Sequence, residues 1–228
     1  MMTSETTSAP GRSVRDELLL AAVDLLNEHG PDALQTRKVA AAAGTSTMAV
    51  YTHFSGMPGL IAEIADEGYR QFDAALTVPE TADPVADLFT LGAAYRRYAI
   101  EHPHLYRLMF GSTSAHGINA PAGNVLALTI AEIEQRIPSF AHVVHAVQRS
   151  VRAGRITVDP EADDTTVIAT AAQFWALVHG FMMLELGGFY GAGGAAVVSV
   201  MDSMTAKFFV ALGDSPERVK ESRRAAKT

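Results

Sequence analysis

The side chains with the clearest chemical purpose fall in one short stretch, residues 36–54, which reads TRKVAAAAGTSTMAVYTHF. It holds hydroxyl groups, one phenol and two permanent cations, the groups with which proteins contact DNA phosphates and read base edges. No acidic residue occurs between Asp32 and Glu63, although the chain carries a net charge of −7. The stretch could therefore face an anion without repelling it. The alternative is that the acid-free interval arose by chance in a segment rich in alanine and threonine.

The chain shows none of the sequence patterns that carry common catalytic or cofactor chemistry. It contains no cysteine, no nucleophile elbow, no phosphate-binding Gly–Lys loop and no HExxH helix. The pairs His102/His104 and His142/His145 have spacings that a metal site could use, but no third ligand accompanies either pair. We therefore expect no catalytic residue, no metal site and no cofactor.

The elements that must position the 36–54 stretch are two short helices. Periodicity predicts one helix over 37–43, capped by Thr36, and a second from Ser46 or Thr47 through Phe54. Their inner residues are small and a glycine lies between them, which predicts a helix-turn-helix whose second helix enters the major groove. An ordinary helical corner is the alternative. The outward face of the second helix is expected to hold Thr47, Met48, Tyr51 and Thr52.

Apolar periodicity predicts helices along the rest of the chain, and no strand pattern persists. The 48% hydrophobic content excludes wholesale disorder. Residues 1–12 and the charged tail after Gly213 are expected to be frayed. The further helices are expected at 13–29, 55–75, 83–101, 103–110, 119–136, 140–153, 160–186 and 194–212.

Residues 165–184 form an uncharged run of 20, long enough to cross a membrane. Five polar residues interrupt the run, so we expect a helix buried between other helices and no membrane partner. The first residues lack an apolar segment behind basic ones, which predicts a cytoplasmic protein.

The run TRKVAAAAGTSTMAVYTHFSGMPGLI, preceded by RDELLLAAVDLLNEHGPDALQ, resembles the DNA-binding segment of the TetR family of bacterial transcription regulators. The resemblance is carried above all by Gly-Thr-Ser followed by Val-Tyr-Thr-His-Phe. It implies a homodimer whose paired recognition helices read a palindromic operator in double-stranded DNA. By position it implies base contacts from Ser46, Thr47 and Met48, phosphate contacts from Tyr51 and His53, and backbone bracing by Thr36, Arg37 and Lys38.

Two positions depart from the family pattern. Met57 stands where most relatives carry a lysine, and Thr45 stands where many carry an aliphatic residue. The missing lysine leaves the backbone N–H groups of the helix N-terminus as the substitute phosphate partner. With so few cations, DNA affinity should depend only weakly on salt.

Bulky, soft side chains with a few polar groups gather in the C-terminal two-thirds and predict a cavity for a small apolar or aromatic effector. A plain core filled by methionine and aromatic residues is the alternative. The segment HPHLYRLMF and the set Trp175, His179 and Gly180 resemble one TetR subgroup, in which they flank or brace the effector cavity. The candidate ligand residues are Tyr95, Tyr98, His102, Tyr106, Met109, Phe110, Phe174, Trp175, His179 and Met182.

The last predicted helix carries an apolar stripe at three- and four-residue spacing, from Val197 to Leu212. With the helix before it, it resembles the family's four-helix dimer interface. A purely intramolecular core is the alternative.

The sequence thus predicts an all-α protein with an N-terminal three-helix helix-turn-helix domain (1–76) and a helical ligand-binding and dimerisation domain (77–228). The expected function is that of a ligand-responsive repressor. The alternatives are a small-molecule binding protein that does not use its helix-turn-helix and, more remotely, an all-α enzyme.

Overall fold

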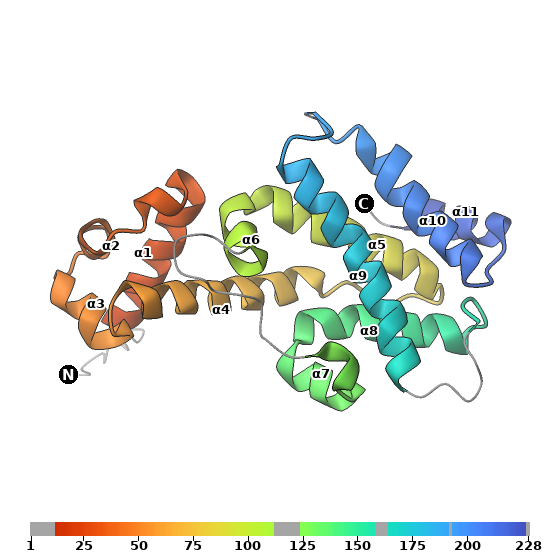
Figure 1. Ribbon diagram of the computed structural model, residues 1–228, viewed down its shortest axis with the longest axis horizontal. Coiled ribbons are helices and arrows are strands. Elements are labelled where there is room, and N and C mark those ends of the chain that lie inside the picture. Colours follow the sequence, from red (N-terminus) through yellow and green to blue (C-terminus); the bar gives the residue numbers. More distant parts are fainter. Residues whose placement is uncertain (1–11, 112–123, 158–163, 192, 227–228) are drawn as a thin grey trace, which may run out of the picture. The chain divides into compact units, whose positions relative to one another are not determined.

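The computed structural model describes residues 12–111, 124–157, 164–191 and 193–226, and all regular structure in these ranges is helical (Figure 1). The predicted all-α class is confirmed. Compactness divides the chain into residues 1–68 with 104–120, and residues 69–103 with 121–228. We call these the N-terminal and C-terminal units. The domain boundary after residue 76 remains a prediction.

The N-terminal unit packs short helices around an apolar centre. Its elements are α1 (Val14–His29), η1 (Pro31–Ala33), α2 (Thr36–Ala42), α3 (Thr47–Phe54), the first part of α4 (Met57–Leu76) and most of α6 (Pro103–Phe110). Ser13 caps α1 by accepting the Asp16 N–H at 3.2 Å. The core contains Leu18, Leu26, Val39, Val50, Leu60, Ile64, Leu105, Tyr106 and Met109.

The start of α2 differs from the prediction by one residue. Thr36 is the first helical residue, and Gln35 holds the cap position without a side-chain cap bond. The reason lies in the backbone, since Gln35 is extended and its carbonyl already accepts the Val39 N–H at 2.9 Å.

In the C-terminal unit, α5, α8 and α9 pack on one another, and α11 packs on α5 and α10. The aromatic and aliphatic faces of α5, α8 and α9 supply most of its core. Its elements are the end of α4, α5 (Pro84–Glu101), η2 (Val125–Ala127), α7 (Ile130–Arg136), α8 (Pro138–Arg152), α9 (Asp164–Leu186), the π-helical turn η3 (Val197–Met201), α10 (Asp202–Ala211) and α11 (Pro216–Ala225).

The single helix predicted over 119–136 is wrong in its described part. Residues 125–127 form a 3-10 turn, and α7 begins only at Ile130. Thr129 and Glu132 form a capping box there, which fixes a new helix start that apolar periodicity alone does not reveal. Residues 119–123 lie outside the described residues, as do the first eleven, which were expected to be frayed.

The tail expected to be frayed after Gly213 instead forms α11. Ser215 caps it by accepting the Arg218 N–H at 3.2 Å, and Val219 and Ser222 are buried. Ser222 belongs to a polar network centred on Arg155, which ties α11 to the N-terminus of α5.

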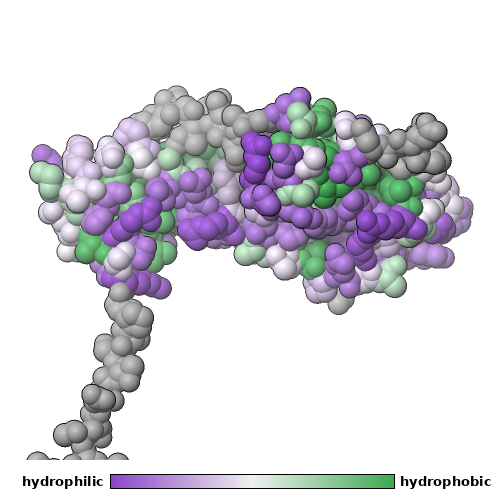
Figure 2. All heavy atoms as spheres, turned by 90° about the horizontal axis from the view of Figure 1, so that it is seen from below, coloured by the Kyte–Doolittle hydropathy of each residue, from purple (hydrophilic) through white to green (hydrophobic). Residues whose placement is uncertain are grey.

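Helix α9 is long and apolar enough to span a membrane by length and composition, and 33% of its most apolar window is buried within the chain. The expectation that other helices of the same chain would enclose it is therefore only partly met. Figure 2 shows hydrophobic atoms at the surface of the C-terminal unit. Its exposed large hydrophobic residues include Met183, Leu184, Phe189, Val198 and Val210.

Candidate functional site

The turn between α2 and α3 is set by one glycine. Gly44 has φ +65°, a left-handed backbone that glycine adopts without strain. The Thr45 N–H then donates to the Ala40 carbonyl at 2.9 Å, which closes the turn. Val39 and Ala40 of α2 and Val50 of α3 are buried, so the small inner faces meet as the sequence predicted.

The opposite face of α3 is open. Met48 is 68% exposed and Tyr51 58% exposed, the largest such values among the bulky apolar and aromatic residues of this unit. Thr52 has its hydroxyl committed to the Met48 carbonyl at 3.0 Å. Seven of the eight residues predicted to bind DNA are exposed: Arg37, Lys38, Ser46, Thr47, Met48, Tyr51 and His53. The eighth, Thr36, is half-buried.

The junction between α3 and α4 holds Tyr51 and the end of α3 in place. A Cβ added at Gly56 would lie 3.5 Å from the Tyr51 ring, so the ring rests beside the start of α4. A Cβ at Gly59 would lie 1.8 Å from the Phe54 carbonyl oxygen, so only glycine fits there. The Tyr51 ring therefore lies next to the N-terminal end of α4, the end of a helix that favours an anion.

An ion pair and a ring contact brace α3 from behind. Arg15 of α1 pairs with Glu63 of α4 at 2.7 Å, and its guanidinium lies 5.2 Å from the centre of the Phe54 ring. The helix-turn-helix therefore presents a fixed, acid-free surface that can donate hydrogen bonds to phosphates.

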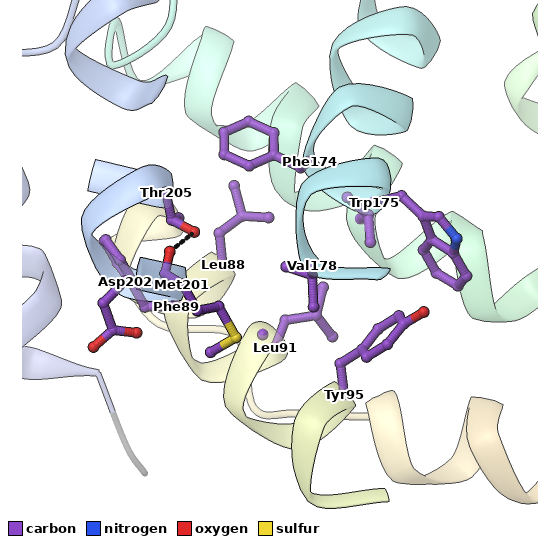
Figure 3. Close-up of a pocket in the computed structure, with 12 residues that line it drawn as sticks. Leu88, Phe89, Leu91, Tyr95, Phe174, Trp175, Val178, Met201, Asp202 and Thr205 are labelled. Atoms are coloured by element: carbon purple, nitrogen blue, oxygen red, sulfur yellow. Dashed lines mark hydrogen bonds between the residues drawn. The ribbon is translucent and has the colours of Figure 1, made fainter. Parts of the chain in front are cut away.

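A separate, small cavity lies among α5, α8, α9 and the η3–α10 junction (Figure 3). Its volume is about 30 Å³, about the room one water needs. Met201 approaches it from the side opposite Trp175, while the Asp202 carboxylate points away (Figure 3). It is lined by Leu88, Phe89, Leu91, Gly92, Tyr95, Val143, Phe174, Trp175, Val178, Met201, Asp202 and Thr205.

An aromatic cluster forms one wall of this cavity. Trp175 lies edge-on to Tyr95, Phe140 and Phe72, with centroid distances of 5.2, 5.6 and 5.9 Å. The Tyr95 hydroxyl lies 3.1 Å from Nδ1 of His179. Burial lowers the pKa of His179, which favours the neutral ring in this apolar setting.

Three of the ten candidate ligand residues, Tyr95, Phe174 and Trp175, line this cavity. His179 contacts Tyr95, and Tyr98 lies beside Phe72 at 5.1 Å. The others do not line it. His102 caps the end of α5, Met182 is fully buried in α9, and Tyr106, Met109 and Phe110 belong to α6 in the N-terminal unit.

The cavity wall includes aliphatic residues that sequence reasoning missed, such as Leu88, Val143 and Val178. They carry no chemical signal. The strong apolar face of α8, with Phe140, Val143 and Val147 buried, is the pattern that could have found one of them.

Comparison with known families decides the identity. Residues 88–208 match the profile described as "Tetracyclin repressor-like, C-terminal domain", and residues 18–64 match "Bacterial regulatory proteins, tetR family". The chain belongs to the TetR family. It is therefore a DNA-binding transcription regulator of a non-enzymatic family. No curated protein matches it.

Solved structures show the same fold. A Rhodococcus sp. RHA1 protein of unknown function is 27% identical with a TM-score of 0.64, covering 92% of this chain and 100% of its own. The putative regulatory protein SCO4313 is 26% identical with a TM-score of 0.60, covering 86% and 94%. RolR in complex with resorcinol is 14% identical with a TM-score of 0.61, covering 94% and 95%.

Proposed function

We propose that this TetR-family chain is a cytoplasmic repressor that binds a palindromic operator as a homodimer and is released by a small apolar or aromatic effector. The observation that supports the proposal most directly is the open face of α3, where Met48 and Tyr51 project into solvent from a rigid, acid-free helix-turn-helix. Two such helices must be spaced by about one DNA turn, about 34–36 Å, to engage both half-sites.

The small cavity lined by Tyr95, Phe174 and Trp175, which we call the aromatic cavity, supports the effector part of the proposal. Its walls suit an apolar or aromatic molecule, and RolR, which shares the fold, has been solved with the small aromatic resorcinol. The Trp175, His179 and Gly180 set further suggests the subgroup whose effector cavity these residues flank. Because the aromatic cavity has room for only about one water, an effector must displace the side chains that line it. The free and effector-bound conformations would then differ, which allostery requires.

Helix α4 is the proposed lever between effector and DNA. It carries Gly59 at the α3 junction and Phe72 against Tyr95 and Trp175 of the aromatic cluster. A coupling of about 1–3 kcal/mol, typical of allosteric proteins, would be enough to lower operator affinity about 5- to 150-fold.

Selection of bound sequences from random DNA duplexes tests the proposal, and a palindromic consensus is the expected result.

Gel shifts on that operator should then show that Tyr51→Phe weakens DNA binding about 3- to 10-fold, because one hydrogen bond to a phosphate is lost. Arg37→Ala should lower the salt slope by about one. Arg224→Ala, an exposed arginine of α11, is the matched control. The proposal would be contradicted if the selection enriched no DNA sequence, or if both variants bound the operator as tightly as the parent protein.

A further inference from the structure

A second, larger cavity lies in the C-terminal unit. Its volume is about 550 Å³, within the range of pockets that hold small molecules. Its walls come from the second half of α5, the start of η3 and α10, and the end of α11. Three arginines, Arg96, Arg97 and Arg223, face it together with apolar side chains such as Ile100 and Val198. We call it the arginine cavity.

Carboxylates hold two of these arginines in position. Arg96 donates Nε and Nη2 to Glu185, both at 2.8 Å, and Arg223 contacts Asp202 at 3.1 Å through Nε and 2.9 Å through Nη2. A guanidinium has five N–H donors, so each retains the Nη1 donors for another acceptor. The two pairs therefore act as fixed donors whose charge is already balanced.

Arg97 differs from its neighbours, because it is exposed and makes no hydrogen bond or ion pair with the residues that the structure describes. Glu101, one turn later, lines the same cavity and is likewise unpaired within the described ranges. Val197 and Val198, at the N-terminal, positive end of the η3–α10 helix, form the facing wall. An anion would thus meet one uncommitted guanidinium, spare N–H donors and a helix N-terminus.

The arginine cavity and the aromatic cavity share a wall. Phe89, Met201 and Asp202 line both, and Met201 is the last residue of the π-helical turn. Short π-helical turns are frequent at functional sites. A ligand whose charged end lay on Arg97 would point an apolar tail at Phe89 and Met201, whose side chains line both cavities.

We infer that the arginine cavity binds an organic carboxylate with an apolar tail. The carboxylate contacts Arg97 and the free donors of Arg96 and Arg223, and the tail displaces Phe89 and Met201 to reach the aromatic cavity. Only the further step, that this molecule is the effector, rests on the proposed function. The binding itself needs no DNA.

Trp175 is the only tryptophan of the chain and lines the aromatic cavity, so it reports where the tail goes. The test uses the full chain without DNA, and octanoate, octanol and octylamine as probes in calorimetry. Octanoate is expected to bind at least about tenfold more tightly than octanol, because only the carboxylate forms charge-assisted bonds with arginine. Bromine is a contact quencher, so 8-bromooctanoate should quench Trp175 fluorescence to saturation.

Three variants and one control variant locate the binding. Arg97→Gln should weaken octanoate about tenfold while changing octanol less than about twofold, and Arg224→Gln should change neither. Glu101→Gln should leave octanoate binding equal or tighter. Gly92→Ala places a methyl group where no atom lies within 4 Å, on the wall of the aromatic cavity, and should lower the quenching without unfolding the protein.

Equal affinity for octanoate and octanol, preference for octylamine, or an Arg97→Gln variant that binds octanoate normally would overturn the inference. So would the absence of saturable binding. Each of these results leaves operator binding untouched. Conversely, a failed operator selection beside normal octanoate binding counts against the proposed function alone.

Discussion

Met48 is the most exposed bulky side chain of α3, so we expect the proposed base recognition to depend on it most. It is a long apolar side chain, 68% exposed, on a face that contains no arginine, lysine, asparagine or glutamine. Such a face cannot form the bidentate bonds that read guanine or adenine. The apolar partner that the major groove offers it is the C5-methyl group of thymine.

We therefore expect one thymine in each operator half-site to contact Met48 through its methyl group. Replacing that thymine by deoxyuridine should weaken binding by about fourfold, the value of one buried methyl group. In the Met48→Ala variant the same replacement should have no effect, which a double-mutant cycle in gel shifts would reveal. Deoxyuridine elsewhere in the operator is the control, and a loss of equal size in both proteins would contradict the contact.

At the residue scale, the sequence predicted the exposed face of α3 far better than the wall of the cavity. The exposed residues of α3 are Met48 and the polar or amphipathic Thr47, Tyr51, Thr52 and His53. One short periodic pattern places all of them, so a helical wheel finds them. The cavity wall is assembled from Leu88, Val143 and Met201 on three separate helices, and only their tertiary packing brings them together.

At the scale of elements, one buried polar network holds α11. Arg155 is 6% exposed and donates to Asp214 at 2.8 Å, to Asp83 at 2.9 Å and to Ser222 at 2.9 Å. Ser222 in turn donates to Asp83 at 2.6 Å. The network thus joins the segment just after α8, the N-terminal cap of α5 and the middle of α11.

Removing the centre of this network should destabilise the C-terminal unit. Arg155→Ala leaves the fully buried Asp214 carboxylate without its main partner, and such a loss costs about 3–5 kcal/mol. We expect a clear drop in the melting temperature, followed by circular dichroism. Arg152→Ala, an exposed arginine three residues earlier, should change stability by less than about 0.5 kcal/mol. Similar melting of the two variants would show that α11 is held by other contacts.

The same network predicts how stability responds to acid. Burial alone would raise the pKa of Asp83, but hydrogen bonds from Ser222 and two backbone N–H groups, with the charge of Arg155, lower it below its usual value. A lowered pKa stabilises the folded state at neutral pH. That contribution declines as the pH drops below the unfolded-state value of about 3.9 and disappears below the folded-state pKa.

Asp83→Asn should therefore flatten the fall in melting temperature between neutral pH and about pH 3. The variant keeps an N-cap side chain, so α5 itself should remain capped. If the melting temperatures of the parent protein and the variant fall equally between neutral pH and about pH 3, Asp83 does not supply the pH dependence.

Helix α11 also shows why the sequence misjudged an element. Its residues are mostly charged, so apolar periodicity gives no signal, and its burial rests on Val219, Ser222 and ion pairs made by residues distant in sequence. Helices α5 and α6 were predicted almost to the residue, because their starts are marked locally. A capping aspartate precedes α5, and α6 begins with a proline.

At the scale of the whole molecule, we expect the exposed apolar side chains of α9 and the segment after it to pack against a second copy in the proposed homodimer. The chain is expected to sediment as a dimer. Leu184→Glu places a charge on the exposed part of α9 and should shift the protein to a monomer in analytical ultracentrifugation. Leu126→Glu, at a position of almost equal exposure (44% against 45%), should remain dimeric. A monomeric parent protein would contradict the expected assembly.

The continuity of α4 has a geometric consequence. Gly59 and Phe72 stand on one uninterrupted helix, and thirteen steps of 1.5 Å separate them by about 20 Å along its axis. A single residue inserted midway would therefore shift the helical phase of Phe72 relative to Gly59 by about 100°. Such an insertion should disrupt the proposed coupling through α4 while leaving the side chains at both ends of the helix unchanged.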